Sequence, residues 1–228
     1  MSLSSYQGEE IITNIIIKGG KKIIERKYFP RTVFNDPAGK NAYIIGNGES
    51  RIGFDLYTLP QDTYGCNALY RDYEPDYLIV GDKKMHMEIV DSEYDQKNIV
   101  YTNHSNMIRN GGVSHLVPYN PNKGAGTTAM HIAIQDGHSQ LFCIGFDCAN
   151  DGPNYNVYKD TPCYKSSTTN VKQSVWAEQI YELAKSNPEV TWTFVGGNQP
   201  LKIINLDNCR RISYNALSTH ISNINETA

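Results

Sequence analysis

Small and polar residues stand where the apolar runs of this sequence end. The first run leads into Gly46, Asn47, Gly48 and Ser50, within the string YIIGNGES at 43–50. Two glycines one residue apart either form a tight turn or let something approach the main chain closely. Bare amides and an asparagine side chain can hold a phosphate or a ribose. We therefore expect a phosphate- or sugar-binding turn here.

Similar side chains follow four later apolar runs. They are Asn67 after the second run, Asp82 after the third, His104 after the fourth, and Gly145, Phe146 and Asp147 after the fifth. In an open parallel sheet, ligands bind outside the carboxyl ends of the strands. Turn formation explains each of these residues taken singly, but the five strand ends together predict one pocket.

A second anion site is expected at 124–128, the string GAGTT. Bare amides at a helix start, with the hydroxyls of Thr127 and Thr128, suit a phosphate or a carboxylate, although a plain capped helix start is the alternative. A nicotinamide-dinucleotide fingerprint is not supported, because Arg51 stands where GxGxxG needs glycine. The spacings typical of a metal site are also missing, so we expect no resident metal and no cofactor.

The apolar runs also predict the fold. Seven runs are expected to be strands, at 42–46, 64–69, 76–82, 98–103, 140–147, 190–196 and 201–207. They are apolar nearly throughout, which is typical of parallel strands buried on both faces. Helices are expected at 83–93, 127–137 and 171–186. Alternating strands and helices indicate an α/β fold, a three-layer sandwich with a mostly parallel, Rossmann-like sheet.

Residues 1–40 differ from the rest. The runs 11–17 and 21–29 flank Gly19 and Gly20, which predicts a β-hairpin. We expect 1–40 to be a hairpin extension and linker, and 41–228 to be a Rossmann-like nucleotide-sugar-binding domain. The irregular stretch 148–169 follows a strand end at the expected pocket, which suits a lid.

Composition narrows the partners. The formal net charge of -3 argues against a nucleic-acid partner. No apolar run is long enough for a membrane span, and the five cysteines form no CxxC pair. We expect a cytoplasmic protein that binds a small molecule, with a homo-oligomer through the hairpin as a further expectation.

At this point a family resemblance is visible. YIIGNGES, then CNALY at 66–70, PDYLIVGD at 75–82, GTTAMHIAIQDGHSQLFCIGFD at 126–147 and GPNY at 152–155 follow one another in an order that resembles the bacterial sialyltransferases. The likeness covers roughly 42–155, with a weaker one at 204–217. The string also resembles a related domain of pterin-pyrophosphokinase-like proteins. The sialyltransferase resemblance implies a metal-independent site for a cytidine-monophosphate sugar.

The resemblance implies roles for individual residues. Asn47 would contact the donor near its phosphate or sugar, and Asn67 would contact the nucleotide. The remaining implied contacts are Thr127 and Thr128 near the carboxylate or phosphate, Gly145, Phe146 and Asp147 around the cytidine and ribose, and Tyr155 as a lid tyrosine on the leaving phosphate. The family's catalytic histidine has no counterpart after the lid, so His104 is the candidate base.

We therefore expect a glycosyltransferase-like protein with a nucleotide-sugar donor, a cytidine nucleotide being preferred. One alternative is a magnesium-dependent diphosphokinase-type enzyme, in which Asp82 and Asp147 share the ion. The other is a non-catalytic nucleotide-binding or oligomeric structural protein.

Overall fold

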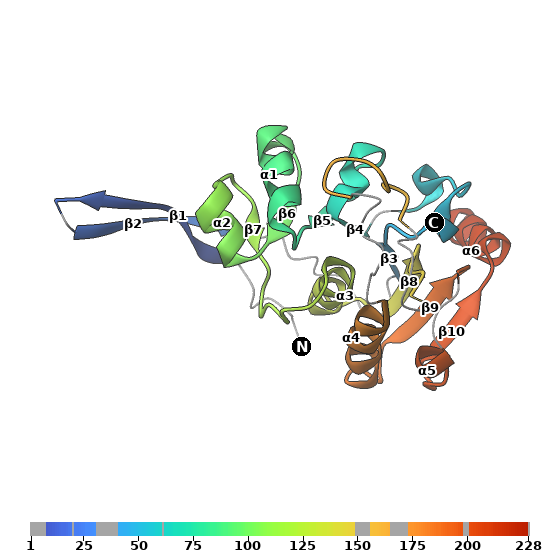
Figure 1. Cartoon of the computed structure of the whole chain (residues 1–228). Helices are drawn as coiled ribbons and strands as arrows, with labels where there is room; N and C mark the ends of the chain where they lie inside the picture. Colours follow the sequence, from blue (N-terminus) through green and yellow to red (C-terminus); the bar gives the residue numbers. More distant parts are fainter. Residues whose placement is uncertain are drawn as a thin grey trace.

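The chain folds into two sheets and the helices that pack on the larger one (Figure 1). The computed structural model describes residues 8–19, 21–30, 41–60, 62–148, 156–164, 173–197 and 201–227. One sheet is a two-stranded hairpin and the other has eight strands.

The eight-stranded sheet is parallel throughout. Its order is β10-β9-β8-β3-β4-β5-β6-β7, and each neighbouring pair runs in the same direction. The strands are β3 Asn41–Ile45, β4 Thr63–Cys66, β5 Tyr77–Ile79, β6 Val100–Thr102, β7 His115–Leu116, β8 Gln140–Ile144, β9 Thr191–Val195 and β10 Cys209–Ile212. The predicted α/β fold with a Rossmann-like parallel sheet is therefore confirmed.

Both faces of this sheet are covered. Along β3, Ala42 and Ile44 lie in one apolar cluster, while Tyr43 and Ile45 lie in the other. Successive side chains of a strand point to opposite faces, so a strand buried on both sides must be apolar at every position. This is why the runs in the sequence do not alternate.

Two sets of helices form the outer layers. Helices α3 Ala125–Gln135 and α4 Gln173–Lys185 cover one face, through residues such as Met130 and Ile180. Helices α1 Lys83–Asp91 and α6 Tyr214–Thr227 cover the other, through residues such as Ile89 and Leu217. Figure 1 shows the two layers on either side of the sheet. Helix α2 His104–Asn110 packs against α1.

One predicted strand is wrong. The run 201–207 forms a short helix instead, α5 Leu201–Ile204, and the edge strand of the sheet is β10. A short apolar run does not by itself distinguish a buried strand from a buried helix turn. Here Ile203 is fully buried while its neighbours on the chain are more exposed, a pattern that one helical turn satisfies. Strands β7 and β10 and helices α2 and α6 were not predicted.

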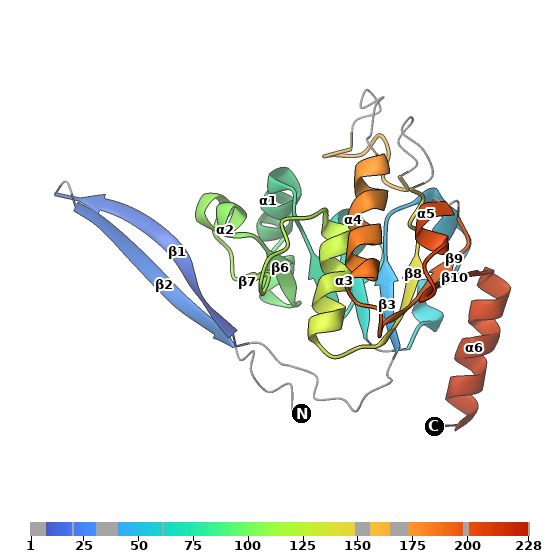
Figure 2. The same cartoon turned by 90° about the horizontal axis from the view of Figure 1, so that it is seen from below.

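The predicted hairpin is present. Strands β1 Gly8–Lys18 and β2 Lys21–Pro30 pair antiparallel, with a register shift between Ile12 and Asn14. The hairpin projects from the side of the body that carries α2 and β7 (Figures 1 and 2), and β1 contacts both of these elements. Self-association through the hairpin stays a prediction.

Two further features bear on the class of protein. Among the described residues, no helix combines the length and the apolar character that a membrane span requires. All five cysteines carry free thiols.

Candidate functional site

A single pocket gathers almost every residue that the sequence singled out. It has a volume of about 1000 Å³ and lies at the carboxyl ends of β3, β4, β5, β6 and β8, beside the first turn of α3. The predicted residues that line it are Gly46, Asn47, Gly48, Asn67, Asp82, His104, Thr127, Thr128, Gly145, Phe146 and Asp147. Ser50 does not line it, and Tyr155 lies outside the described residues.

Three amides of the first loop are already bonded, contrary to expectation. The Gly46 amide donates to the carbonyl of Ile144 at 2.8 Å, and the Gly48 amide donates to the carbonyl of Gly145 at 2.8 Å. The amide of Ser50 donates to Asp147 Oδ2 at 2.7 Å. These three donors hold the loop against the end of β8, so they are not available to a phosphate.

The two glycines serve this close approach. A Cβ on Gly46 would lie 2.5 Å from the carbonyl oxygen of Gly145, and one on Gly48 would lie 2.5 Å from Asp147 Oδ2. Both distances are shorter than real Cβ contacts. The glycines are therefore needed where the loop after β3 meets the loop after β8. The group that approaches the main chain closely is this second loop and not a ligand.

Two asparagines at the pocket keep an oxygen free. Asn47 donates its side-chain amide to the carbonyl of Cys66 at 3.0 Å, which orients the side chain across to β4. Asn67 has a φ of 53°, a left-handed conformation that asparagine tolerates better than most residues. The side-chain oxygens of both residues are buried and have no hydrogen-bond partner among the described residues. Buried polar atoms are normally paired, so each invites a donor from a ligand.

The two aspartates at the pocket have partly structural roles. Asp147 accepts from Ser50 through Oδ2, while its Oδ1 is buried without a partner in the described part of the chain. Asp82 is the N-cap of α1, where its Oδ1 accepts from the amides of Lys84 at 2.9 Å and Met85 at 3.0 Å. An N-cap of this kind begins the helix directly after β5.

The start of α3 is the second predicted anion site, and its donors are free. The helix begins at Ala125, two residues earlier than expected, with Gly124 as its N-cap and no side-chain cap. For the amides of Ala125, Gly126 and Thr127, the described structure shows no acceptor. A Cβ on Gly126 would lie 2.8 Å from Phe146 Cε1, so glycine lets the ring pack against this turn.

One of the two threonine hydroxyls in this turn bonds to the main chain. Thr127 and Thr128 are both buried and both line the pocket. The hydroxyl of Thr128 donates to the carbonyl of Lys123 at 3.3 Å, so it stabilises the turn and does not cap the helix as expected. Lys123, directly before the N-cap Gly124, also lines the pocket and carries a positive charge.

His104 reaches the pocket from α2. Asn103 caps this helix by accepting from the amide of Asn106 at 2.9 Å, which makes His104 the first helical residue. Its side chain is exposed, and it lines the pocket on the side of β5 and β6. The fold therefore brings the candidate base to the same pocket as Asn47 and the start of α3.

Several pocket residues were missed at the level of sequence. They are Asn120, Asn122, Lys123, Asn156, Gln173 and Trp176. Trp176 is 42% exposed and Val175 beside it is 46% exposed, whereas Ile180 and Leu183 of the same helix are buried. A tryptophan shortly after the predicted lid is the one feature of the sequence that could have indicated that α4 lines the pocket.

The pocket thiols and carboxylates do not form a recognised catalytic or metal-binding cluster. Burial raises the pKa of both Cys66 and Cys148 to about 12, so neither is a thiolate near neutral pH. Within the described ranges, no group of three or more His, Cys, Asp or Glu side chains is arranged to hold a metal ion.

These observations define a class: an α/β protein with a Rossmann-like parallel sheet and a polar pocket at its carboxyl edge. No model of a known protein family matches the sequence, and no curated protein matches it either.

Solved structures of one enzyme are similar in fold. The sialyltransferase CstII from Campylobacter jejuni, in complex with cytidine-5′-monophosphate, is 14% identical; the match covers 70% of this chain and 81% of that chain, with a TM-score of 0.45. The same enzyme with CMP-3FNeuAc is 13% identical over 68% and 80%, with a TM-score of 0.44. At these identities the likeness does not assign individual residues, so their roles follow from the contacts described above.

Proposed function

We propose that this protein is a glycosyltransferase-like protein that binds a nucleotide-sugar donor, with a cytidine nucleotide preferred. One observation carries the proposal. The pocket joins amides at the start of α3 to three buried acceptor oxygens, on Asn47, Asn67 and Asp147, and none of these groups has a partner among the described residues. The order of motifs along the sequence supports the same class of donor.

The phosphate would sit at the start of α3. The helix has 11 residues, and the partial positive charge of its first turn favours an anion there. Lys123 adds a full positive charge at the rim. Because these groups meet the charge of a phosphate, the proposed reaction does not need a metal ion for that purpose.

The nucleoside would face the acceptor oxygens. Ribose hydroxyls and the exocyclic amine of cytosine are hydrogen-bond donors, which these oxygens can accept. Uracil carries a carbonyl where cytosine has its amine, so it would leave one oxygen unpaired, at a cost of roughly 1–3 kcal/mol. Phe146 and Trp176 give the pocket aromatic surface against which a base or sugar can pack.

The proposed reaction is a displacement at the anomeric carbon. An acceptor hydroxyl forms the new bond to that carbon, the bond from the carbon to the phosphate oxygen breaks, and the nucleoside monophosphate leaves with the electron pair. The amides at the start of α3 stabilise the charge that develops on the leaving phosphate. His104 is placed to take the proton of the acceptor hydroxyl.

The diphosphokinase-type alternative is less well supported. It needs Asp82 and Asp147 as shared metal ligands, but each accepts from a backbone amide through one oxygen, Asp147 from Ser50 in the loop after β3 and Asp82 from Met85 in its own helix. The non-catalytic alternative predicts nucleotide binding without transfer, and an activity assay separates it from the proposal.

The first experiment is a thermal-shift panel of cytidine, uridine, adenosine and guanosine monophosphates, with and without magnesium. Cytidine 5′-monophosphate (CMP) at 100 times its Kd should add about 2.7 kcal/mol of stability. The Asn47→Ala variant should lose that shift, because it removes a buried acceptor. The matched control is Asn98→Ala, whose side chain donates to the carbonyl of Tyr94, outside the pocket. A CMP shift that survives Asn47→Ala would contradict the placement of the site.

The second experiment asks whether binding leads to chemistry. The full chain is incubated with a CMP-linked sugar, and release of CMP is followed with and without candidate acceptors. Release that disappears in His104→Ala while CMP still binds would support the proposed reaction. Binding without any release would favour the non-catalytic alternative.

A further inference from the structure

Two loops at the pocket share a spacing that the proposed function leaves unexplained. Asn47 in the loop after β3 is followed four residues later by Arg51. Asn67, in the turn Asn67–Arg71 after β4, is followed four residues later by Arg71. Each asparagine lines the pocket. Each arginine contacts one segment, residues 156–164, which we call the brace segment.

Tyr158 of the brace segment lies between the two arginines. It is 6% exposed, and the guanidinium carbons of Arg51 and Arg71 lie 5.6 and 5.8 Å from the centre of its ring. Arg51 Nη2 donates to the Tyr158 hydroxyl at 2.7 Å, and this hydroxyl donates to Asp72. Arg51 and Asp72 also form an ion pair at 3.5 Å. One tyrosine thus joins both loops by cation–π and hydrogen-bond contacts.

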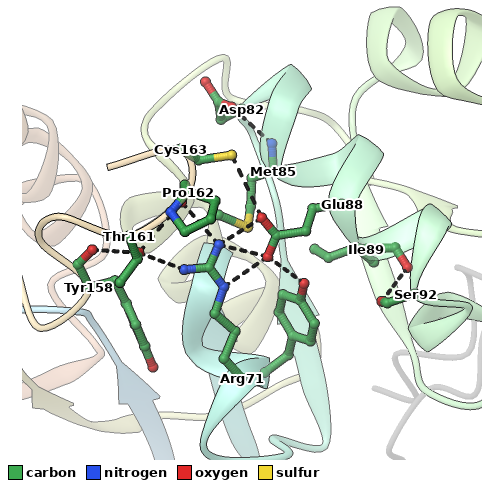
Figure 3. Close-up of polar contacts among 11 residues, drawn as sticks. Arg71, Asp82, Met85, Glu88, Ile89, Ser92, Tyr158, Thr161, Pro162 and Cys163 are labelled. Atoms are coloured by element: carbon green, nitrogen blue, oxygen red, sulfur yellow. Dashed lines mark hydrogen bonds and ion pairs between the residues drawn. The ribbon is translucent and has the colours of Figure 1, made fainter. Parts of the chain in front are cut away.

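Arg71 attaches the brace segment to helix α1 (Figure 3). Its Nε and Nη2 donate to the two oxygens of Glu88 at 2.8 and 2.7 Å, the fork geometry that fixes an arginine in one orientation. Its Nη1 donates to the hydroxyl of Thr161 at 2.7 Å, and its Nη2 to the carbonyl of Pro162 at 3.0 Å.

The brace segment also contacts the pocket loops directly. The amide of Val157 donates to the main-chain carbonyl of Asn47 at 2.9 Å. Asn156 and Gly48 form an antiparallel bridge. Burial raises the pKa of Tyr164, and its phenol has both the Asn47 side chain and the backbone of Ala68 as neighbours. The brace segment therefore holds the main chain of Asn47 and lies beside its side chain.

We propose that Tyr158 is a positioning residue, which fixes Asn47 and Asn67 so that their free oxygens face the nucleoside. This inference rests on the proposed function for its ligand, but the brace itself does not. A binding group held in place before the ligand arrives loses less conformational entropy on binding. The start of α3 has its own support in the helix, so its affinity for phosphate should not depend on Tyr158.

The ligand-free test compares the full chain with Tyr158→Phe and Tyr158→Ala. Hydrogen exchange is measured for the backbone amides of 46–51 and 67–71. Phenylalanine keeps the ring but loses the bonds to Arg51 and Asp72, so exchange in both loops should quicken moderately; alanine should quicken it further. The control is Tyr57→Phe. The hydroxyl of Tyr57 also donates to Asp72, to its carbonyl at 3.3 Å, but the Tyr57 side chain is 74% exposed.

The affinity test separates positioning from general damage. Tyr158→Phe should weaken CMP binding about fivefold to tenfold, which lies within the range of about twofold to thirtyfold for residues that act through a contact network. Binding of inorganic phosphate, measured on the same variant, should stay within about twofold of wild type. A variant that was merely destabilised would not separate the two ligands in this way.

Different results identify different failures. Unchanged exchange in both loops of Tyr158→Ala would overturn the brace, whatever the ligand. Equal loss of CMP and phosphate affinity would also overturn the positioning role. If the wild-type chain binds no cytidine nucleotide while exchange responds as expected, the brace stands and the proposed function fails.

Discussion

The loop after β3 and the start of α3 make an instructive pair. Both were predicted as anion sites for the same reason, namely glycines next to polar side chains at the carboxyl edge of a sheet. In the structure, the amides of Gly46 and Gly48 are bonded to the end of β8, while the amides of Ala125, Gly126 and Thr127 are free. The first region is a packed contact between two loops of the fold, and the second has the donors that a phosphate needs.

The difference teaches how glycine spacing should be interpreted. Glycine shows that something approaches the main chain closely, but it does not show what approaches. The answer depends on the neighbours: β3 lies beside β8, so its loop meets another loop. A helix start has no such partner because its first amides cannot bond within the helix.

The largest expected effect tests the close packing between the loops after β3 and β8. Gly46→Ala places a methyl group 2.5 Å from the carbonyl oxygen of Gly145 and 3.3 Å from the ring of Phe146, so we expect a loss of about 3 kcal/mol in the free energy of unfolding. Urea denaturation measures it. Gly81→Ala is the matched control, because the nearest atoms to its Cβ lie 4.0 Å away. If Gly46→Ala unfolds at the wild-type urea concentration, the glycine serves something other than close packing.

A smaller effect concerns pH, and it must be known before binding at α3 is compared across pH. Burial lowers the pKa of His86 from 6.5 to about 4, while the charge of Asp95 opposes the shift. The neutral ring has contacts with Ser114 at 3.2 Å and Asn110 at 3.1 Å.

The unfolded chain therefore takes up a proton at a higher pH than the folded chain. Stability is complete above about pH 6.5 and should fall by about 2 kcal/mol as the pH drops towards 4. His86→Gln should remove this part of the pH dependence, which denaturation at several pH values would reveal. Equal slopes for the two proteins would show that His86 is not the cause.

The smallest of the three effects tests the helix start. Thr127→Asp puts a negative charge in the first turn of α3, where it repels a bound phosphate; CMP should bind at least about tenfold more weakly. Thr127→Asn is the neutral control of nearly the same shape. Calorimetric titration gives both affinities. If the two variants bind CMP equally well, the phosphate does not lie at this helix. The conclusion that the start of α3 is the anion site would then be wrong.

Much of the fold was predictable, because burial on both faces leaves a clear pattern. The six strands from β3 to β9, apart from the two-residue β7, coincide with predicted runs. The exceptions are informative. The run 201–207 has the same composition as a strand but forms α5, and the polar edge strand β10 has only Cys209 buried. An edge strand needs less burial, so its sequence carries a weaker signal.

The candidate site was predictable in its membership and less so in its chemistry. Local sequence placed Asn47, Asn67 and Asp147 at strand ends, and the parallel sheet brought those ends together. The local sequence did not predict which of their atoms would form hydrogen bonds within the protein. Asp82 became an N-cap, and the Ser50 amide bonded to Asp147, because neighbouring loops compete with any ligand for the same donors and acceptors.

The sequence by itself determined a parallel α/β sheet and the polar residues at its carboxyl edge, since both follow from local patterns of burial and turn formation. Only the tertiary structure decided which polar groups remain free. It also brought Tyr158 between Arg51 and Arg71, across 107 and 87 positions of the chain. The physical reason is that a backbone amide has only one N–H to donate. Whether that N–H bonds to a neighbouring strand or to a ligand depends on which strands become neighbours.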